Sequence, residues 1–291
     1  MRVNLPLRYL YTNPAYGDFF LRHGLCPELG IDAQVLDRLP LAWHRDTAAR
    51  LHQAGLQCAV HLPFLDLHPG SSDERVRQLC VDRLCQAIDL ARIYAPAHCV
   101  AHLDFVDWIS GSRQEDWVHQ SALTWAAVLD HLGQVPLFLE NVCESEPGVV
   151  RAVLEALQGR ARMCFDLGHW NSFGQGNTRG NLGQWFTELT PWIGHVHLHD
   201  NDGSADQHLG LGQGSIPWPR VAQFLRVHPD ISITLEPHTL EDFHLTCSYV
   251  RTSSDWVQRT RLGTLPDPRS INIHLPQVQA SFPEIQNTKT R

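Results

Sequence analysis

Histidines and carboxylates recur in this sequence at the ends of short apolar segments. The chain contains 18 histidines, and nine candidate ligands occupy such positions: His61, His102, Glu140, Asp166, His169, His197, Asp206, His208 and Glu236. Imidazole with carboxylate, without paired thiolates, suits Zn²⁺, Mn²⁺ or Fe²⁺. The five histidines favour zinc. Nine ligands exceed what one ion can use, so the sequence predicts two or three ions.

A single histidine at a strand end is more often a hydrogen-bonded core residue than a metal ligand. The set as a whole is different, because burying so many titratable groups together costs desolvation and carboxylate repulsion unless cations neutralise them. The pattern therefore favours a metal centre.

The elements that position these residues are short apolar segments alternating with longer amphipathic stretches, which is typical of βα units. Eight strands are predicted: Leu5–Leu10, Cys26–Ile31, Gln57–Phe64, Ala97–Leu103, Pro136–Val142, Arg162–Leu167, Ile193–His199 and Ile231–Glu236. Eight units close into a barrel, whose active site forms at the C-terminal strand ends. The prediction is an α/β fold, a single (β/α)8 TIM barrel.

The helices and chain ends complete this prediction. Ser72–Tyr94 has apolar residues at helical spacing with Ser72 as N-cap, and the last helix is expected at Leu240–Arg261. Residues 1–264 are expected to form the catalytic barrel. Residues 265–291 are rich in Pro, Ser, Asn and Gln without periodicity, and are expected to form an extended C-terminal tail.

Composition narrows the class of protein. The 291 residues have a formal net charge of -8 and 43% hydrophobic residues, which describes a globular protein without a broad basic surface for a polyanion. No segment approaches the ~18 apolar residues of a membrane helix, and no signal peptide is evident, so a cytoplasmic location is expected. The eight cysteines form no C-x-x-C pairs and are predicted to be mostly buried thiols.

The ordered ligand set resembles the endonuclease IV family of the xylose-isomerase-like barrels (AP endonuclease family 2). The similarity runs from His61 to Glu236 and includes all nine positions, with the motifs Asp166-x-x-His169, His197-Leu198-x-Asp200 and Asp206-x-His208. The resemblance implies that Glu140 bridges two metals. His61 and His102 would bind the first, Asp166, His197 and Glu236 the second, and His169, Asp206 and His208 a third.

The chain also departs from that family. It has no basic loops for gripping DNA, and His199 stands where the family commonly has Asn. It is compatible with a cobamide-remodelling branch of the superfamily, which hydrolyses the phosphodiester of the nucleotide loop. We therefore expect a metal-dependent hydrolase of a small or medium nucleotide-containing phosphodiester, with Glu140 and Glu236 as catalytic residues and metal-activated water as nucleophile.

Three other functions stay open. A one-metal sugar or sugar-phosphate isomerase or epimerase would use Glu140, Asp166, His197 and Glu236, with the glutamates moving protons. An abasic-site DNA endonuclease is the second alternative, although duplex DNA is not the expected partner. A metal-stabilised binding protein without turnover is the third. Oligomeric state is left open by the sequence.

Further residues near the candidate ligands are expected to contact substrate or to support the ligands. Phe64, Trp170 and Glu28 are candidate substrate contacts. Lining of the barrel mouth is the competing interpretation for Phe64, and contact with a neighbouring ligand is the competing interpretation for Glu28. Asn141 and Asp200 are expected to orient ligands. Outer or surface roles are favoured for three other histidines: His68, His195 and His238.

Overall fold

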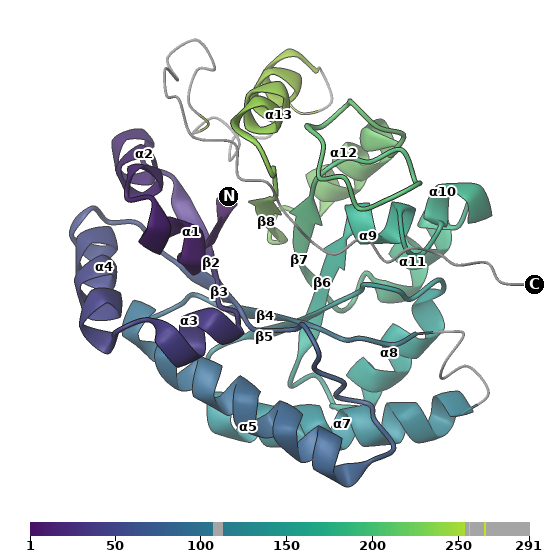
Figure 1. Cartoon of the computed structure of the whole chain (residues 1–291). Coiled ribbons are helices and arrows are strands. Elements are labelled where there is room, and N and C mark those ends of the chain that lie inside the picture. The colour runs from purple at the N-terminus through teal and green to yellow at the C-terminus, as the bar shows by residue number, and fades with distance from the viewer. Residues whose placement is uncertain (107–112, 254–255, 257–264, 266–291) are drawn as a thin grey trace, which may run out of the picture.

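Eight parallel strands close into a barrel in the computed structural model, which describes residues 1–106, 113–253, 256 and 265. Each strand pairs with the next and β1 pairs with β8 (Figure 1). The strands are β1 (Arg2–Pro6), β2 (Cys26–Gly30), β3 (Ala59–His61), β4 (Cys99–His102), β5 (Leu137–Glu140), β6 (Arg162–Asp166), β7 (Ile193–Leu198) and β8 (Ser232–Leu235). The predicted (β/α)8 fold is confirmed.

Helices surround the strands (Figure 1). They are α1 (Leu7–Thr12), α2 (Ala15–His23), α3 (Ala33–Arg38), α4 (Leu41–Gln53), α5 (Glu74–Ala91), the 3-10 helix η1 (Arg92–Tyr94), α7 (Gln114–Leu132), α8 (Pro147–Ala156), α9 (Leu167–Asn171), α10 (Gly176–Arg179), α11 (Leu182–Leu189), α12 (Trp218–Val227) and α13 (Leu240–Thr252). Apolar residues of both layers form the main core, for example Leu139 of β5 with Val150 and Val153 of α8. This packing holds the strand ends in place.

Three predicted boundaries are wrong. The first strand is Arg2–Pro6 and not Leu5–Leu10, because helix α1 begins after Pro6 and buries Leu7 and Leu10, three residues apart, on one face. The N-cap of α5 is Asp73 and not Ser72, since the Asp73 carboxylate accepts from the Arg75 amide at 2.8 Å. The last helix ends at Thr252, where the backbone of Ser253 is extended.

The C-terminal part of the prediction lies largely outside the described residues. This holds for 254–255 and 257–264 of the expected last helix and for 266–291 of the expected tail. Leu265, the first expected tail residue, is buried, and its carbonyl accepts from the Arg251 guanidinium.

Two expectations from composition can be compared with the structure. All eight cysteines lie among the described residues; none of them forms a disulfide, and five of them are buried. Among the described residues, no helix is long and apolar enough to cross a membrane.

The sheet register places candidate ligands side by side at the C-terminal strand ends. His102 of β4 is paired with Glu140 of β5, and Asp166 of β6 with His197 of β7. Alternate residues of a strand face the same side, so β7 and the residue after it direct His195, His197 and His199 into the barrel at successive levels.

Candidate metal centre

Glu140 lies at the middle of the ligand cluster and is almost fully buried. Its Oε2 is 3.0 Å from His61 Nε2 and 3.6 Å from His102 Nε2. Its Oε1 is 3.1 Å from His169 Nδ1 and 3.3 Å from His197 Nδ1. The two oxygens therefore face different groups of histidines, an arrangement in which one carboxylate can hold two ions.

A second group of ligands surrounds His197. Its Nδ1 is 3.3 Å from Glu236 Oε1 and 3.6 Å from Asp166 Oδ2. The Asn4 amide donates to the same Glu236 oxygen at 3.2 Å. The structure thus brings together Asp166, His197 and Glu236 as the resemblance implied, and adds Asn4, which the sequence analysis missed because it lies on the first strand, far from every motif.

The remaining three predicted ligands form a third group. Asp206 Oδ2 is 3.0 Å from His208 Nε2 and 3.6 Å from His169 Nε2. His208 has a φ of 51°, in the left-handed region that a non-glycine residue rarely adopts and that costs about 1–3 kcal/mol. All nine predicted ligands therefore converge on one region of the barrel mouth.

Three of the histidines share a hydrogen-bond pattern that fixes their ring nitrogens. The Nδ1 atoms of His61, His169 and His208 lie 2.9, 3.0 and 2.8 Å from the backbone carbonyls of Leu62, Asn141 and Glu236. A carbonyl only accepts, so Nδ1 carries a proton and Nε2 is the nitrogen that faces a carboxylate, Glu140 for His61 and Asp206 for His169 and His208. A second proton or a metal ion can occupy the place between Nε2 and the carboxylate.

The electrostatics of the cluster indicate the same need for positive charge. Burial disfavours the charged form of Glu140, yet the surrounding histidines, His197 and His102 foremost, hold its pKa well below the usual value. Burial also disfavours the imidazolium of His208, but the adjacent Asp206 outweighs it and raises the pKa of His208 to about 9. Metal ions satisfy these carboxylates without protonating the histidines.

Several buried polar atoms of the cluster have no hydrogen-bond partner: Asp166 Oδ2, Asp206 Oδ1, His197 Nδ1 and both ring nitrogens of His199. Buried polar atoms are nearly always paired. Three overlapping sets bring ligand atoms within 4.8 Å of one another: His61, His102 and Glu140; Asp166, His169 and His199; and His199, Asp206 and His208. The residues present therefore fit divalent cations.

Asn141 holds the backbone of the candidate ligand Asp166, and Asp200 holds the turn that follows the candidate ligands Asp206 and His208. The Asn141 side chain accepts from the Asp166 amide at 2.9 Å and donates to the Asp166 carbonyl at 3.0 Å. Asp200 accepts from the Gly212 amide at 2.9 Å and from the Trp218 indole at 2.7 Å. Gly212 has a φ of 83°, which suits glycine in this turn.

Of the two expectations for Glu28, its position agrees with contact to a neighbouring candidate ligand and not with contact to substrate. It is fully buried beneath the cluster, where it accepts from Thr234 Oγ1 at 2.7 Å. Its Oε2 lies 3.2 Å from His195 Nε2, and its Oε1 lies 2.8 Å from His197 Nε2. Glu28 thus contacts a ligand rather than the open mouth. His195 belongs to this lower layer, together with His98, which the sequence analysis missed.

Trp170 does not lie where a substrate contact is expected. Only 1% of it is exposed, and its indole donates to Asn181 Oδ1 at 3.0 Å while its ring packs on Gly176. The aromatic that is exposed on this side is Phe173, 47% exposed and 5.5 Å from the His169 ring between centroids. The sequence offered no signal to prefer Phe173, since both aromatics follow His169 closely.

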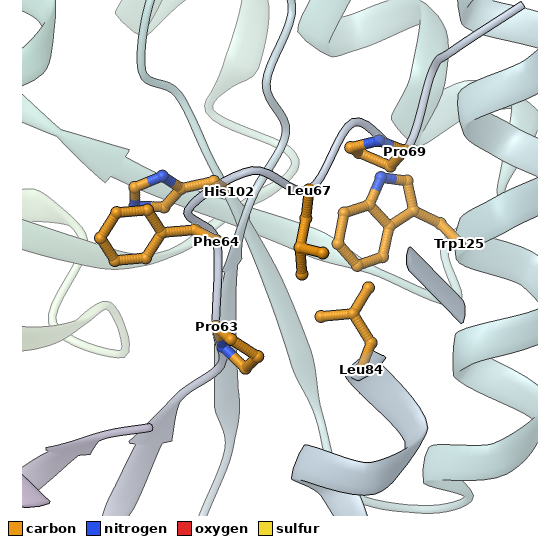
Figure 2. A pocket seen from close by; sticks show the side chains of 7 residues that line it. All are labelled: Pro63, Phe64, Leu67, Pro69, Leu84, His102 and Trp125. Atoms are coloured by element: carbon orange, nitrogen blue, oxygen red, sulfur yellow. The ribbon is translucent and has the colours of Figure 1, made fainter. Parts of the chain in front are cut away.

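Phe64 remains a candidate contact at the mouth. It is 38% exposed and stacks on His102, with ring centroids 4.0 Å apart, as Figure 2 shows. A small cavity of about 10 Å³ lies behind the two rings and is closed by apolar side chains, among them Leu67, Leu84 and Trp125 (Figure 2). The cavity has room for about one water molecule. One side of Phe64 thus faces solvent, and the small cavity lies behind its other side.

The other two predicted outer histidines lie at the edge of the site. His68 is exposed and its Nδ1 lies 2.7 Å from Asp104 Oδ2. The His238 ring stacks on His208, with centroids 3.7 Å apart.

Fold and ligand geometry define a (β/α)8 barrel with candidate metal-binding groups at its C-terminal strand ends. Residues 26–259 match the model of the xylose isomerase-like TIM barrel family (AP endonuclease family 2), and the chain belongs to that family.

Comparisons with individual proteins agree with this family. The chain is 27% identical over 201 residues to the uncharacterised protein MJ1311 of Methanocaldococcus jannaschii, covering 64% of this chain and 66% of that one, somewhat less than two thirds of the relative. The TTHB071 protein from Thermus thermophilus, solved after soaking with ZnCl₂, is 27% identical, with a TM-score of 0.68 over 85% of this chain and 95% of that one. A D-psicose 3-epimerase from Clostridium cellulolyticum shares the fold at 15% identity, with a TM-score of 0.62 over 93% and 92% of the two chains.

Proposed function

We propose that this protein is a metal-dependent phosphodiester hydrolase with a multinuclear, preferentially zinc, centre. One observation carries the proposal: five candidate ligands beyond the set needed for one metal lie in the same cluster, three of them beside Glu140 and the others around Asp206. They are His61, His102, His169, Asp206 and His208. The zinc-soaked structure of a relative supports the choice of zinc.

The roles of the residues follow from their geometry. Glu140 would be shared by two ions, since its two oxygens face different histidines. Glu236 lies beside His197, accepts a hydrogen bond from the Asn4 amide, and would orient the reacting groups. Bound divalent cations would supply Lewis acidity and charge neutralisation at the phosphoryl group. No serine or cysteine nucleophile is required.

The substrate we propose is a compact nucleotide-containing metabolite, for example the nucleotide loop of a cobamide. Duplex DNA is held mainly by clustered Lys and Arg, whereas this chain has 23 Lys and Arg residues against 31 Asp and Glu residues. Among the described residues, the candidate ligands form ion pairs only with one another and with neighbouring His and Glu side chains. Phe64 and Phe173, both exposed beside ligands, can stack on a ring of a small ligand.

The test compares two phosphodiesters. Zinc-loaded protein is incubated with adenosylcobamide and, separately, with an abasic-site duplex at physiological salt, and the products are separated by chromatography and electrophoresis. We expect cobamide cleavage and little nicking. Efficient nicking with intact cobamide would establish the DNA endonuclease instead.

Metal counting tests the centre itself. The third group predicts that His208→Ala lowers the bound metal by about one equivalent while the fold is retained. An unchanged metal content in this variant contradicts the three-ion centre.

A one-metal sugar epimerase is the second candidate. Glu140, Asp166, His197 and Glu236 do converge around one point, and several solved structures with this fold are sugar epimerases. This function predicts one tightly bound equivalent and exchange of a substrate carbon-bound proton with solvent deuterium. Near three equivalents without such exchange supports the hydrolase.

A further inference from the structure

His199 is a buried histidine outside the set of nine predicted ligands. It follows β7 directly, its side chain is fully buried, and neither ring nitrogen has a hydrogen-bond partner. A buried polar group without a partner costs about 1–3 kcal/mol, so two such atoms on one ring call for an explanation.

The surroundings of His199 are those of a ligand. Its Nε2 lies 3.2 Å from Asp166 Oδ1 and 3.7 Å from Asp206 Oδ1. These distances match those among the predicted ligands, such as 3.6 Å between His169 Nε2 and Asp206 Oδ2. Asp206 Oδ1 also has no hydrogen-bond partner. His199 Nε2 and Asp206 Oδ1 therefore face each other, and neither atom is hydrogen-bonded.

Gly168, which has no side chain, leaves space for the His199 ring. A Cβ on Gly168 would lie 1.8 Å from His199 Cε1, so only glycine is compatible with the observed ring position. The other face of the ring stacks on His208 with centroids 3.7 Å apart. Gly168 and His208 therefore hold the imidazole with its Nε2 near both aspartates.

We propose that His199 is a tenth metal ligand, binding the ion otherwise held by His169, Asp206 and His208. The inference rests on the metal centre of the proposed function but not on the reaction catalysed there. Three imidazoles and one carboxylate make four side-chain ligands, a number that fills a tetrahedral zinc site. The ion in this position would be held more firmly than one sharing Glu140 with His61 and His102.

The experiment compares His199→Asn with His238→Asn. His238 is a matched control, because its ring also stacks on His208, with centroids 3.7 Å apart, but it is exposed and no carboxylate contact of it is found among the described residues. Each purified protein is loaded with zinc and dialysed against graded concentrations of a competing chelator, and retained zinc is counted. The shorter asparagine side chain fits the space at this position, and its amide does not reach the place of the His199 Nε2 atom.

We expect His199→Asn to lose one equivalent at a chelator concentration at least about 10-fold lower than wild type does, and His238→Asn to behave like wild type. Replacing zinc with Co²⁺ gives a second readout, because loss of a ligand changes the visible absorption of the ion even when the fold is intact. Circular dichroism of the metal-free variants checks folding. Should His199→Asn fail to fold, His199→Ala takes its place in the same titration.

The proposal would be overturned if the folded His199 variant retained zinc as the wild type does and its cobalt spectrum were unchanged. Equal weakening in both variants would do the same, since it would assign the effect to ring stacking on His208. A wild-type protein that binds three ions with this pattern but cleaves no phosphodiester would leave the tenth ligand standing and reject the proposed hydrolase.

Discussion

Two layers of polar residues occupy the barrel interior, and they satisfy their polar atoms differently. In the lower layer, His195 Nδ1 lies 2.6 Å from Ser232 Oγ and its Nε2 3.1 Å from Thr234 Oγ1, while Thr234 donates to Glu28. In the upper layer, both nitrogens of His199 lack partners.

This difference distinguishes the lower layer, a structural hydrogen-bond network, from the upper layer, the candidate metal centre. Both layers bring histidine and carboxylate atoms within 4.8 Å of one another, for example Glu28, His98 and His195 below and His61, His102 and Glu140 above. Proximity alone therefore does not identify a metal site. Hydroxyl groups satisfy both nitrogens of His195 and one oxygen of Glu28 in the lower layer, although Glu28 Oε1 and His98 Nε2 have no hydrogen-bond partner. No hydroxyl group of the described residues satisfies the two nitrogens of His199 in the upper layer, where the candidate metal ligands lie.

The largest effect is expected from Glu140→Gln in the upper layer. Glu140 is the carboxylate that faces both histidine groups, so loss of its charge should remove metal and lower phosphodiester turnover by about 100- to 1,000-fold or more. Steady-state kinetics with metal counting measures this. A variant that keeps a tenth of the wild-type activity would contradict the shared carboxylate.

Removing the metals is expected to destabilise the folded protein measurably. A ligand that binds only the folded state at 100 times its Kd adds about 2.7 kcal/mol to the free energy of unfolding. Thermal unfolding of metal-free protein with and without added zinc should therefore show a higher melting temperature with zinc. Equal melting temperatures would indicate that the upper layer, like the lower one, does not bind zinc.

Thr234→Val tests the lower layer. The Thr234 hydroxyl contacts both Glu28 and His195, and its loss removes a hydrogen bond to the buried Glu28 carboxylate, at a cost of about 1.5–3 kcal/mol in the free energy of unfolding. Urea denaturation of the metal-free protein measures the cost. We expect the zinc stoichiometry to stay at the wild-type value, and loss of an equivalent would show that the two layers act as one.

The smallest effect is expected from Phe173→Ala at the rim. Phe173 is exposed beside His169, and an aromatic contact with substrate contributes about 1 kcal/mol, which corresponds to roughly five-fold in KM. Metal content and kcat should hardly change. Trp170→Phe is the comparison variant, since the buried Trp170 should affect stability and leave KM unchanged.

The barrel and the convergence of the nine candidate ligands could be predicted from the sequence because they depend on local patterns. Alternating short apolar strands and amphipathic helices suffice for the (β/α)8 topology. Parallel strands in such a barrel all end on one face, so polar residues at strand ends such as Glu140 and His197 had to meet. The first strand was misplaced because the segment from Leu5 to Leu10 is compatible with both a strand and a short helix.

Only the tertiary structure decided which of these polar residues are satisfied by the protein itself. Glu28, His195 and Thr234 are separated by up to 206 positions in the chain, and no local pattern tells that a hydroxyl on β8 reaches a carboxylate on β2. The same holds for the space that Gly168 leaves for His199 and for the exchange of Trp170 for Phe173 at the rim. These outcomes depend on side-chain directions and close packing between strands, which residue type and spacing along one chain do not encode.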